Sequence, residues 1–213
     1  MTQEEERKYA SLMVKAYGWL KKFQQKHPSF TFRINRNGAY LFRVSSKRDY
    51  FQVVLGSKNE HVEFKLRFEP NSDFSDIQCI KCVVNCGDRK VSEHSPYKKF
   101  LCDELKLELK ADSRYNADIL ISRGSGSAEN DLFAWLQQHF DALNEALKDT
   151  QLSHEEFANI EKKRLFELCD GGWLKRSDDG SYAVPETAIF SGSEDSEDKD
   201  DMLGRGGEAK WTS

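Results

Sequence analysis

Residues 61–68 alternate strictly between polar and apolar side chains, and no other pattern in the sequence constrains the fold as much. The apolar members are Val62, Phe64, Leu66 and Phe68, and the polar members are His61, Glu63, Lys65 and Arg67. Side chains of a strand alternate between the two faces of a sheet, so this segment predicts a strand with one buried face and one face in water. We therefore expect an antiparallel sheet that carries its helices on the buried face only.

Neighbouring segments extend this strand into a meander. Alternating segments at 30–34 and 40–44 flank Asn37-Gly38, and a further strand is expected at 50–55. A three-residue loop with Gly38 left-handed places both apolar sets of this hairpin on one face, whereas a two-residue turn would place them on opposite faces. We expect the longer loop, because it gives the sheet a single apolar side.

Helices are predicted where apolar residues recur every three or four positions. Residues 4–26 and 129–148 have this spacing, and we expect both helices to pack on the apolar side of the sheet. With 38% hydrophobic and 32% charged residues, a chain of 213 residues can bury one core and still present a polar surface. The expected fold class is α+β.

Between these helices the pattern predicts further short elements. Residues 77–84 form a β-branched strand, and Ser95-Pro96 begins a short helix that ends near Asp103. Leu105, Leu107 and Leu109 then alternate with polar residues, which predicts a strand at 104–110. Residues 117–122 would return as its hairpin partner.

The C-terminal part is predicted to be a helix and hairpin followed by an acidic tail. Ser153 and Glu156 form a capping box, and Asp179-Gly180 forms a turn. The segment 152–184 resembles the end of a winged-helix domain, but a complete domain of that family has two further helices, so no DNA-binding role follows from the resemblance. The predicted organisation is an α+β domain at 1–150, a helix-hairpin appendage at 151–186 and a disordered acidic tail at 187–213.

Charge divides the chain into two unlike parts. Residues 1–110 contain 21 Lys and Arg against 14 Asp and Glu, and residues 111–213 contain 11 against 22. The net charge of -4 therefore hides a basic first part. Such asymmetry suits contact with a polyanion or screening of one part by the other, and the alternative is an ordinary solvated surface with an acidic tail.

Basic residues fall at positions that the alternation directs into water. A twisted sheet that presents Arg and Lys between aromatic rings suits a phosphate backbone with stacked bases, and the alternative is a basic face that contacts water alone. Tyr50 and Gln52 are expected nearby. The candidate nucleic-acid-binding residues are Arg33, Arg43, Lys47, Arg48, Lys65 and Arg67.

A nuclease is the enzymatic alternative. Glu63 and Lys65 project from the same face of their strand, and with Asp49 their spacing resembles the acidic-x-lysine arrangement of restriction-like nucleases. The resemblance implies Mg²⁺ held by the carboxylates and a water oriented by the lysine. The same residues also fit an ordinary charge pattern on an exposed strand.

Cysteines suggest a zinc site only weakly. Cys79 and Cys82 lie three positions apart on one predicted strand and point to opposite faces, so we expect buried thiols and no metal or other cofactor. The chain opens with acidic residues and has no apolar run of the roughly 18 residues that a membrane span needs, so we expect a cytoplasmic protein without membrane contact.

No sequence motif names a catalytic residue. The histidines form no His-Glu-x-x-His pair, and no serine lies in a Gly-x-Ser-x-Gly turn. We expect a non-enzymatic binding or accessory subunit of a complex, whose partner is nucleic acid or a nucleic-acid-processing protein. The alternatives are the Mg²⁺-dependent nuclease and a purely protein-binding module.

Overall fold

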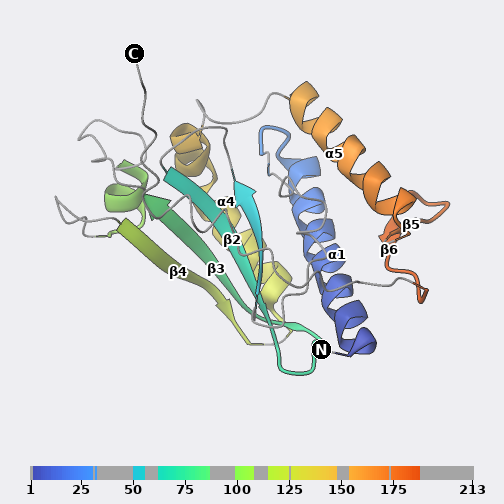
Figure 1. The fold of residues 1–213 in the computed structure, drawn as a ribbon. Helices are drawn as coiled ribbons and strands as arrows, with labels where there is room; N and C mark the ends of the chain where they lie inside the picture. The colour runs from blue at the N-terminus through green and yellow to red at the C-terminus, as the bar shows by residue number, and fades with distance from the viewer. Residues whose placement is uncertain are drawn as a thin grey trace, which may run out of the picture.

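A computed structural model describes residues 2–30, 32, 50–55, 62–86, 99–107, 115–124, 126–147, 154–172 and 174–187. Figure 1 shows helices and an antiparallel sheet, which confirms the α+β class. The elements in chain order are α1 (Gln3–Lys26), β1 (Phe51–Leu55), β2 (Val62–Pro70), β3 (Ile77–Cys86), η1 (Phe100–Glu104), β4 (Tyr115–Arg123), α4 (Ala128–Leu147), α5 (His154–Asp170), β5 (Lys175–Arg176) and β6 (Tyr182–Ala183). The predicted loop of the early hairpin, 36–38, lies outside the described residues.

The main sheet is a meander whose described strands run in the order β1-β2-β3-β4, each antiparallel to the next. In β2, Phe64, Leu66 and Phe68 are completely buried, whereas Lys65 and Arg67 on the opposite face are partly exposed. The predicted alternation is therefore confirmed over this part of β2. The face that carries Phe64, Leu66 and Phe68 is called the inner face below.

Helices α1 and α4 both contribute to the core on the inner face, as the sequence predicted. They also contact each other: the ring centroid of Phe23 lies 5.8 Å from that of Phe133 and 6.0 Å from that of Phe140. At the rim of this contact, Lys22 Nζ lies 2.8 Å from Glu129 Oε1. The aromatic cluster thus joins the two helices on the inner side of the sheet.

The start of α1 is stabilised by a capping box. Thr2 Oγ1 accepts a hydrogen bond from the Glu5 backbone N–H at 3.2 Å, and Glu5 Oε2 accepts one from the Thr2 N–H at 2.7 Å. The helix ends before Pro28, where the His27 N–H donates to the carbonyls of Phe23 and Gln24. Both ends thus follow from local sequence.

Helix α5 lies alongside α1 (Figure 1). Glu161 of α5 accepts hydrogen bonds from the Tyr17 hydroxyl and from Lys21 Nζ, the latter at 3.0 Å. Leu168 and Leu174 are buried in the same core cluster as the residues of α1. The C-terminal segment thus joins the core through both an apolar contact and a polar cluster.

Tyr17 links α5 to the pH dependence of stability. Burial first, and then the neighbouring Glu161 carboxylate, raise the pKa of Tyr17 above its ordinary value of 10.0. The folded protein therefore keeps the phenolic proton where the unfolded chain loses it, so this contribution to stability is complete below pH 10 and decreases as the pH rises further.

We expect the advantage of the wild type over Tyr17→Phe in unfolding free energy to be constant below about pH 9. Above pH 10 it should shrink by about 1.4 kcal/mol per pH unit, because only the wild type carries the phenol. Urea unfolding of both proteins from pH 7 to 11 measures this difference. If the unfolding free energies of the two proteins changed in parallel with pH, folding would not raise the pKa of Tyr17 and the prediction would be contradicted.

The predicted strand at 104–110 is wrong over its described part, 104–107. Glu104 ends η1, and Lys106 has a positive φ of 55°, which turns the chain out of the helix. The Leu107 N–H then donates to the Leu101 carbonyl at 3.0 Å. Leu105 and Leu107 pack against the core on either side of this turn, which explains why they alternate without forming a strand.

Residues 117–122 also pair with a strand other than the predicted one at 104–110. Strand β4 includes the predicted residues 117–122, but its described partner is β3, with Cys82 opposite Ile119 and Val83 opposite Asp118. The segment before β4 is instead anchored to α4, because Glu104 Oε1 lies 2.6 Å from Nδ1 of the buried His139. The order of the sheet follows from this pairing, and β4 becomes the fourth strand of the meander.

The small C-terminal hairpin matches its prediction. Strands β5 and β6 pair antiparallel, and Gly180 has a positive φ of 84° in the turn between them. The Asp179 carboxylate accepts hydrogen bonds from the backbone N–H and the hydroxyl of Ser181, at 2.9 and 2.7 Å. An Asp-Gly turn of this kind needs a residue that tolerates a left-handed backbone, which glycine does.

Candidate nucleic-acid interface on the outer face of the sheet

The face of the sheet opposite the helices is called the outer face. Residues that lie directly opposite one another on neighbouring strands share a face, so the register of the sheet defines its members. These members form three rows across the strands: Lys65, Val83 and Asp118; Gln52, Arg67, Lys81 and Leu120; Glu69, Cys79 and Arg123.

Cations outnumber carboxylates on the outer face. Among the residues whose side chains are described, it carries four cations, Lys65, Arg67, Lys81 and Arg123, and two carboxylates, Glu69 and Asp118. Alternation along β2 assigns a third carboxylate, Glu63, to the same face. Two ion pairs join these groups: Arg67 Nη1 lies 3.2 Å from Asp118 Oδ2, and Lys81 Nζ lies 2.7 Å from Glu69 Oε1. The hydrogen bond to Glu69 raises the pKa of Lys81, so this lysine is charged at neutral pH. The described outer face therefore has an excess of positive charge that is partly neutralised within the sheet.

An aromatic ring supports one of the cations. Arg67 lies with its guanidinium carbon 4.3 Å from the ring centroid of Tyr50, the residue that precedes β1. A guanidinium over an aromatic face is held by a cation–π attraction and keeps its N–H donors directed outward around the ring. The sequence predicted such a combination, with Tyr50 near the basic residues of the sheet.

Apolar residues are also present on the outer face. Leu120 is 49% exposed, whereas Val83 and Cys79 are buried. Lys65 lies opposite Val83 and is itself partly buried, and long lysine stems commonly cover apolar neighbours while the charge stays in water. The outer face thus combines buried apolar side chains with charged groups that reach the solvent.

Two of the six predicted interface residues can be placed. Lys65 and Arg67 lie on the outer face, as predicted. The other four, Arg33, Arg43, Lys47 and Arg48, lie outside the described residues. The structure adds Lys81, Arg123 and Asp118 to this surface.

For the nuclease alternative, Asp49 lies outside the described residues and the side chain of Glu63 is not described. Lys65, which would orient the water, is on the outer face, and alternation along β2 assigns Glu63 to the same face. The structure thus places one member of the three-residue set.

Cys79 and Cys82 lie on opposite faces of β3. Cys82 is completely buried opposite Leu66 on the inner face, and burial raises its pKa to about 12. Burial, and then Glu69, raise the pKa of Cys79 on the outer face. Within the described part of the chain, no three His, Cys, Asp or Glu side chains are grouped so that they could hold a metal ion.

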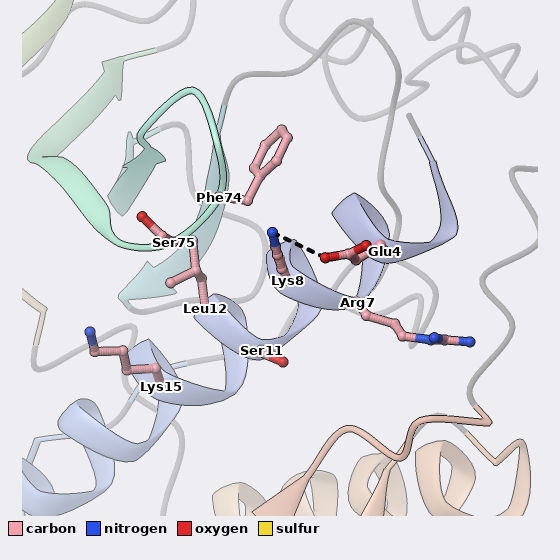
Figure 2. A pocket seen from close by; sticks show the side chains of 8 residues that line it. All are labelled: Glu4, Arg7, Lys8, Ser11, Leu12, Lys15, Phe74 and Ser75. Atoms are coloured by element: carbon pink, nitrogen blue, oxygen red, sulfur yellow. Dashed lines mark ion pairs between the residues drawn. The ribbon is translucent and has the colours of Figure 1, made fainter.

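A second candidate site is a shallow hollow of about 400 Å³ between the start of α1 and the loop after β2 (Figure 2). Its lysines are already paired: Lys8 with Glu4 at 3.3 Å, and Lys15 with Asp76 at 2.9 Å. Figure 2 shows Arg7 extending away from Ser75 on the other side of the hollow. With its charges paired or directed elsewhere, the hollow offers no convergent set of groups to a ligand.

Comparison with known proteins gives no match: no family model, no curated protein and no solved structure is similar to this chain. In the described ranges, no helix combines the length and the apolar character that crossing a membrane requires. The functional inference therefore depends on the outer face itself.

Proposed function

We propose that this chain is a non-enzymatic binding or accessory subunit of a complex, and that it contacts nucleic acid through the outer face of its sheet. The observation that carries the proposal is the excess of cations over carboxylates on this face, four against three when Glu63 is included, with the Arg67 guanidinium over the Tyr50 ring. Positive charge supplies most of the affinity for a phosphate backbone, and planar groups add stacking with bases. We expect Arg33, Arg43, Lys47 and Arg48, which lie outside the described residues, to belong to the same interface.

Single-stranded nucleic acid is the form that this surface suits best. The described cations stand on strands, and helices α1 and α4, which contribute to the core on the inner face, are not placed to enter a duplex groove from the outer side. Unstacked bases can reach a guanidinium or a tyrosine ring, whereas the stacked bases of a duplex cannot. The proposed partner is therefore a single strand, or a partner protein that presents one.

Neutralising the outer-face cations should weaken binding of a labelled single-stranded oligonucleotide of about 20 nucleotides by roughly tenfold at low salt. The variant is Lys65→Gln with Arg67→Gln and Lys81→Gln, which removes three charges and keeps side-chain size. Its matched control is Lys162→Gln with Lys163→Gln and Lys175→Gln, three exposed lysines of the C-terminal segment. Fluorescence anisotropy at several salt concentrations gives affinity and salt dependence together, and the control should change affinity by less than about threefold.

The same assay separates the alternatives. Equal weakening by the two triple variants would assign binding to overall charge and contradict the outer face as the interface. No binding at moderate salt would favour a purely protein-binding module. Cutting of the oligonucleotide with Mg²⁺, lost in Lys65→Ala, would replace the proposal by the nuclease.

A further inference from the structure

Arg67 is held by contacts on more than one side of its guanidinium. Its guanidinium lies over the Tyr50 ring, and its Nη1 donates to a single Asp118 oxygen, Oδ2, at 3.2 Å. Its Nε is enclosed and has no hydrogen-bond partner. Only 20% of the Arg67 side chain is exposed, whereas 47% of the Asp118 side chain is exposed. The Arg67 side chain is therefore mostly buried, whereas about half of the Asp118 side chain is in contact with solvent.

Asp118 accepts from one nitrogen of the Arg67 guanidinium, Nη1, and of the other nitrogens Nε is enclosed. A guanidinium presents five N–H donors in a fork that matches two oxygens of a phosphate, and Asp118 engages it through one oxygen. Ion pairs between partly exposed side chains are weak and exchange with other anions. A phosphate that approaches the outer face could thus take the place of Asp118 without any movement of Arg67 or Tyr50.

We propose that Asp118 is an internal competitor that occupies Arg67 until a nucleic-acid phosphate displaces it, so that Asp118 limits the affinity of the outer face. This inference depends on the proposed function and specifies how the site is regulated. Asp118 lies on β4 and Arg67 on β2, with Lys81 of β3 opposite Arg67. Asp118 therefore competes with phosphate at the middle of the sheet, where we expect the single-stranded nucleic acid to cross the outer face.

The test is a double-mutant cycle in the full-length chain, with binding of a single-stranded oligonucleotide as the readout. Asp118→Asn should tighten binding about fivefold, because it removes the competing charge and keeps the side-chain size. Asp178→Asn, which removes an equal charge from the exposed turn after β5, should tighten it less than about twofold. In an Arg67→Met background, Asp118→Asn should have no larger effect than this control, because Asp118 then has no guanidinium to occupy.

The outcomes distinguish failure of this inference from failure of the proposed function. A gain with Asp118→Asn that disappears in the Arg67→Met background supports competition. A gain that persists without Arg67 shows that Asp118 merely repels the phosphate backbone, and overturns the inference while the proposed function stands. A gain no larger than that of Asp178→Asn overturns it in the same way. Absence of binding by the wild type and by Asp118→Asn at low salt overturns the proposed function and this inference together.

Discussion

The Phe68→Ala variant is expected to lose about 3–5 kcal/mol of unfolding free energy. Phe68 is completely buried on the inner face of β2, and its ring stacks on that of Phe51 at a centroid distance of 5.1 Å and an interplanar angle of 11°. Truncation would remove the buried ring and leave a cavity between β1, β2 and the core, because close-packed neighbours relax only partly. Chemical denaturation followed by circular dichroism measures the change.

Phe166→Ala is the matched control for this prediction. It makes the same chemical change at a residue of α5 that is 69% exposed, so its unfolding free energy should stay within about 0.5 kcal/mol of the wild type. Comparable losses in the two variants would contradict the burial assigned to the inner face. A large loss in Phe68→Ala alone would establish that the alternation along β2 defines the core side of the sheet.

The second large effect is expected where α5 joins α1. Glu161→Ala should lower the unfolding free energy by about 2–3 kcal/mol, because it removes the acceptor for two partly buried donors. The Tyr17 hydroxyl and Lys21 Nζ both donate to this carboxylate, whose side chain is only 16% exposed. Urea unfolding gives the free energy, and limited proteolysis reports whether α5 becomes more accessible.

Glu167→Ala provides the comparison on the same helix. Glu167 is exposed, and exposed charged contacts contribute little, so the variant should change the unfolding free energy by less than about 0.5 kcal/mol. If both variants behaved alike, the polar cluster would have no special role in attaching α5. Selective loss in Glu161→Ala would assign part of the attachment to this cluster in addition to the buried Leu168 and Leu174.

Strand β2 and helices α1 and α4 could be predicted from the sequence because each carries one unbroken periodicity. A one-residue shift of β2 would bury Lys65 and Arg67 and expose Phe64, so only one assignment of its faces is physically possible. The residues 104–107 could not be predicted in this way. Leucines two positions apart also occur where a chain leaves a helix through a left-handed residue, and Lys106 has that conformation.

The candidate interface was only partly predictable for a related reason. Lys65 and Arg67 belong to a strand whose outward positions are evident, whereas Lys81 lies within a mostly apolar segment that reads as buried throughout. Its alternation with Ile80 and Cys82, which lie on the inner face, was the available signal. Asp118 and Arg123 join the outer face only because β4 pairs with β3, and strand pairing is a tertiary property that the local pattern did not determine.

The most direct test of the outer face as a nucleic-acid interface maps the contact without mutation. Full-length ¹⁵N-labelled protein is titrated with a single-stranded oligonucleotide at low salt, and amide shifts are followed residue by residue. We predict that the largest shifts fall in the middle of the sheet, at Lys65, Arg67 and Lys81, and at Arg123 of β4. Shifts confined to α5 and the β5–β6 hairpin, or no shifts at all, would contradict binding by the outer face.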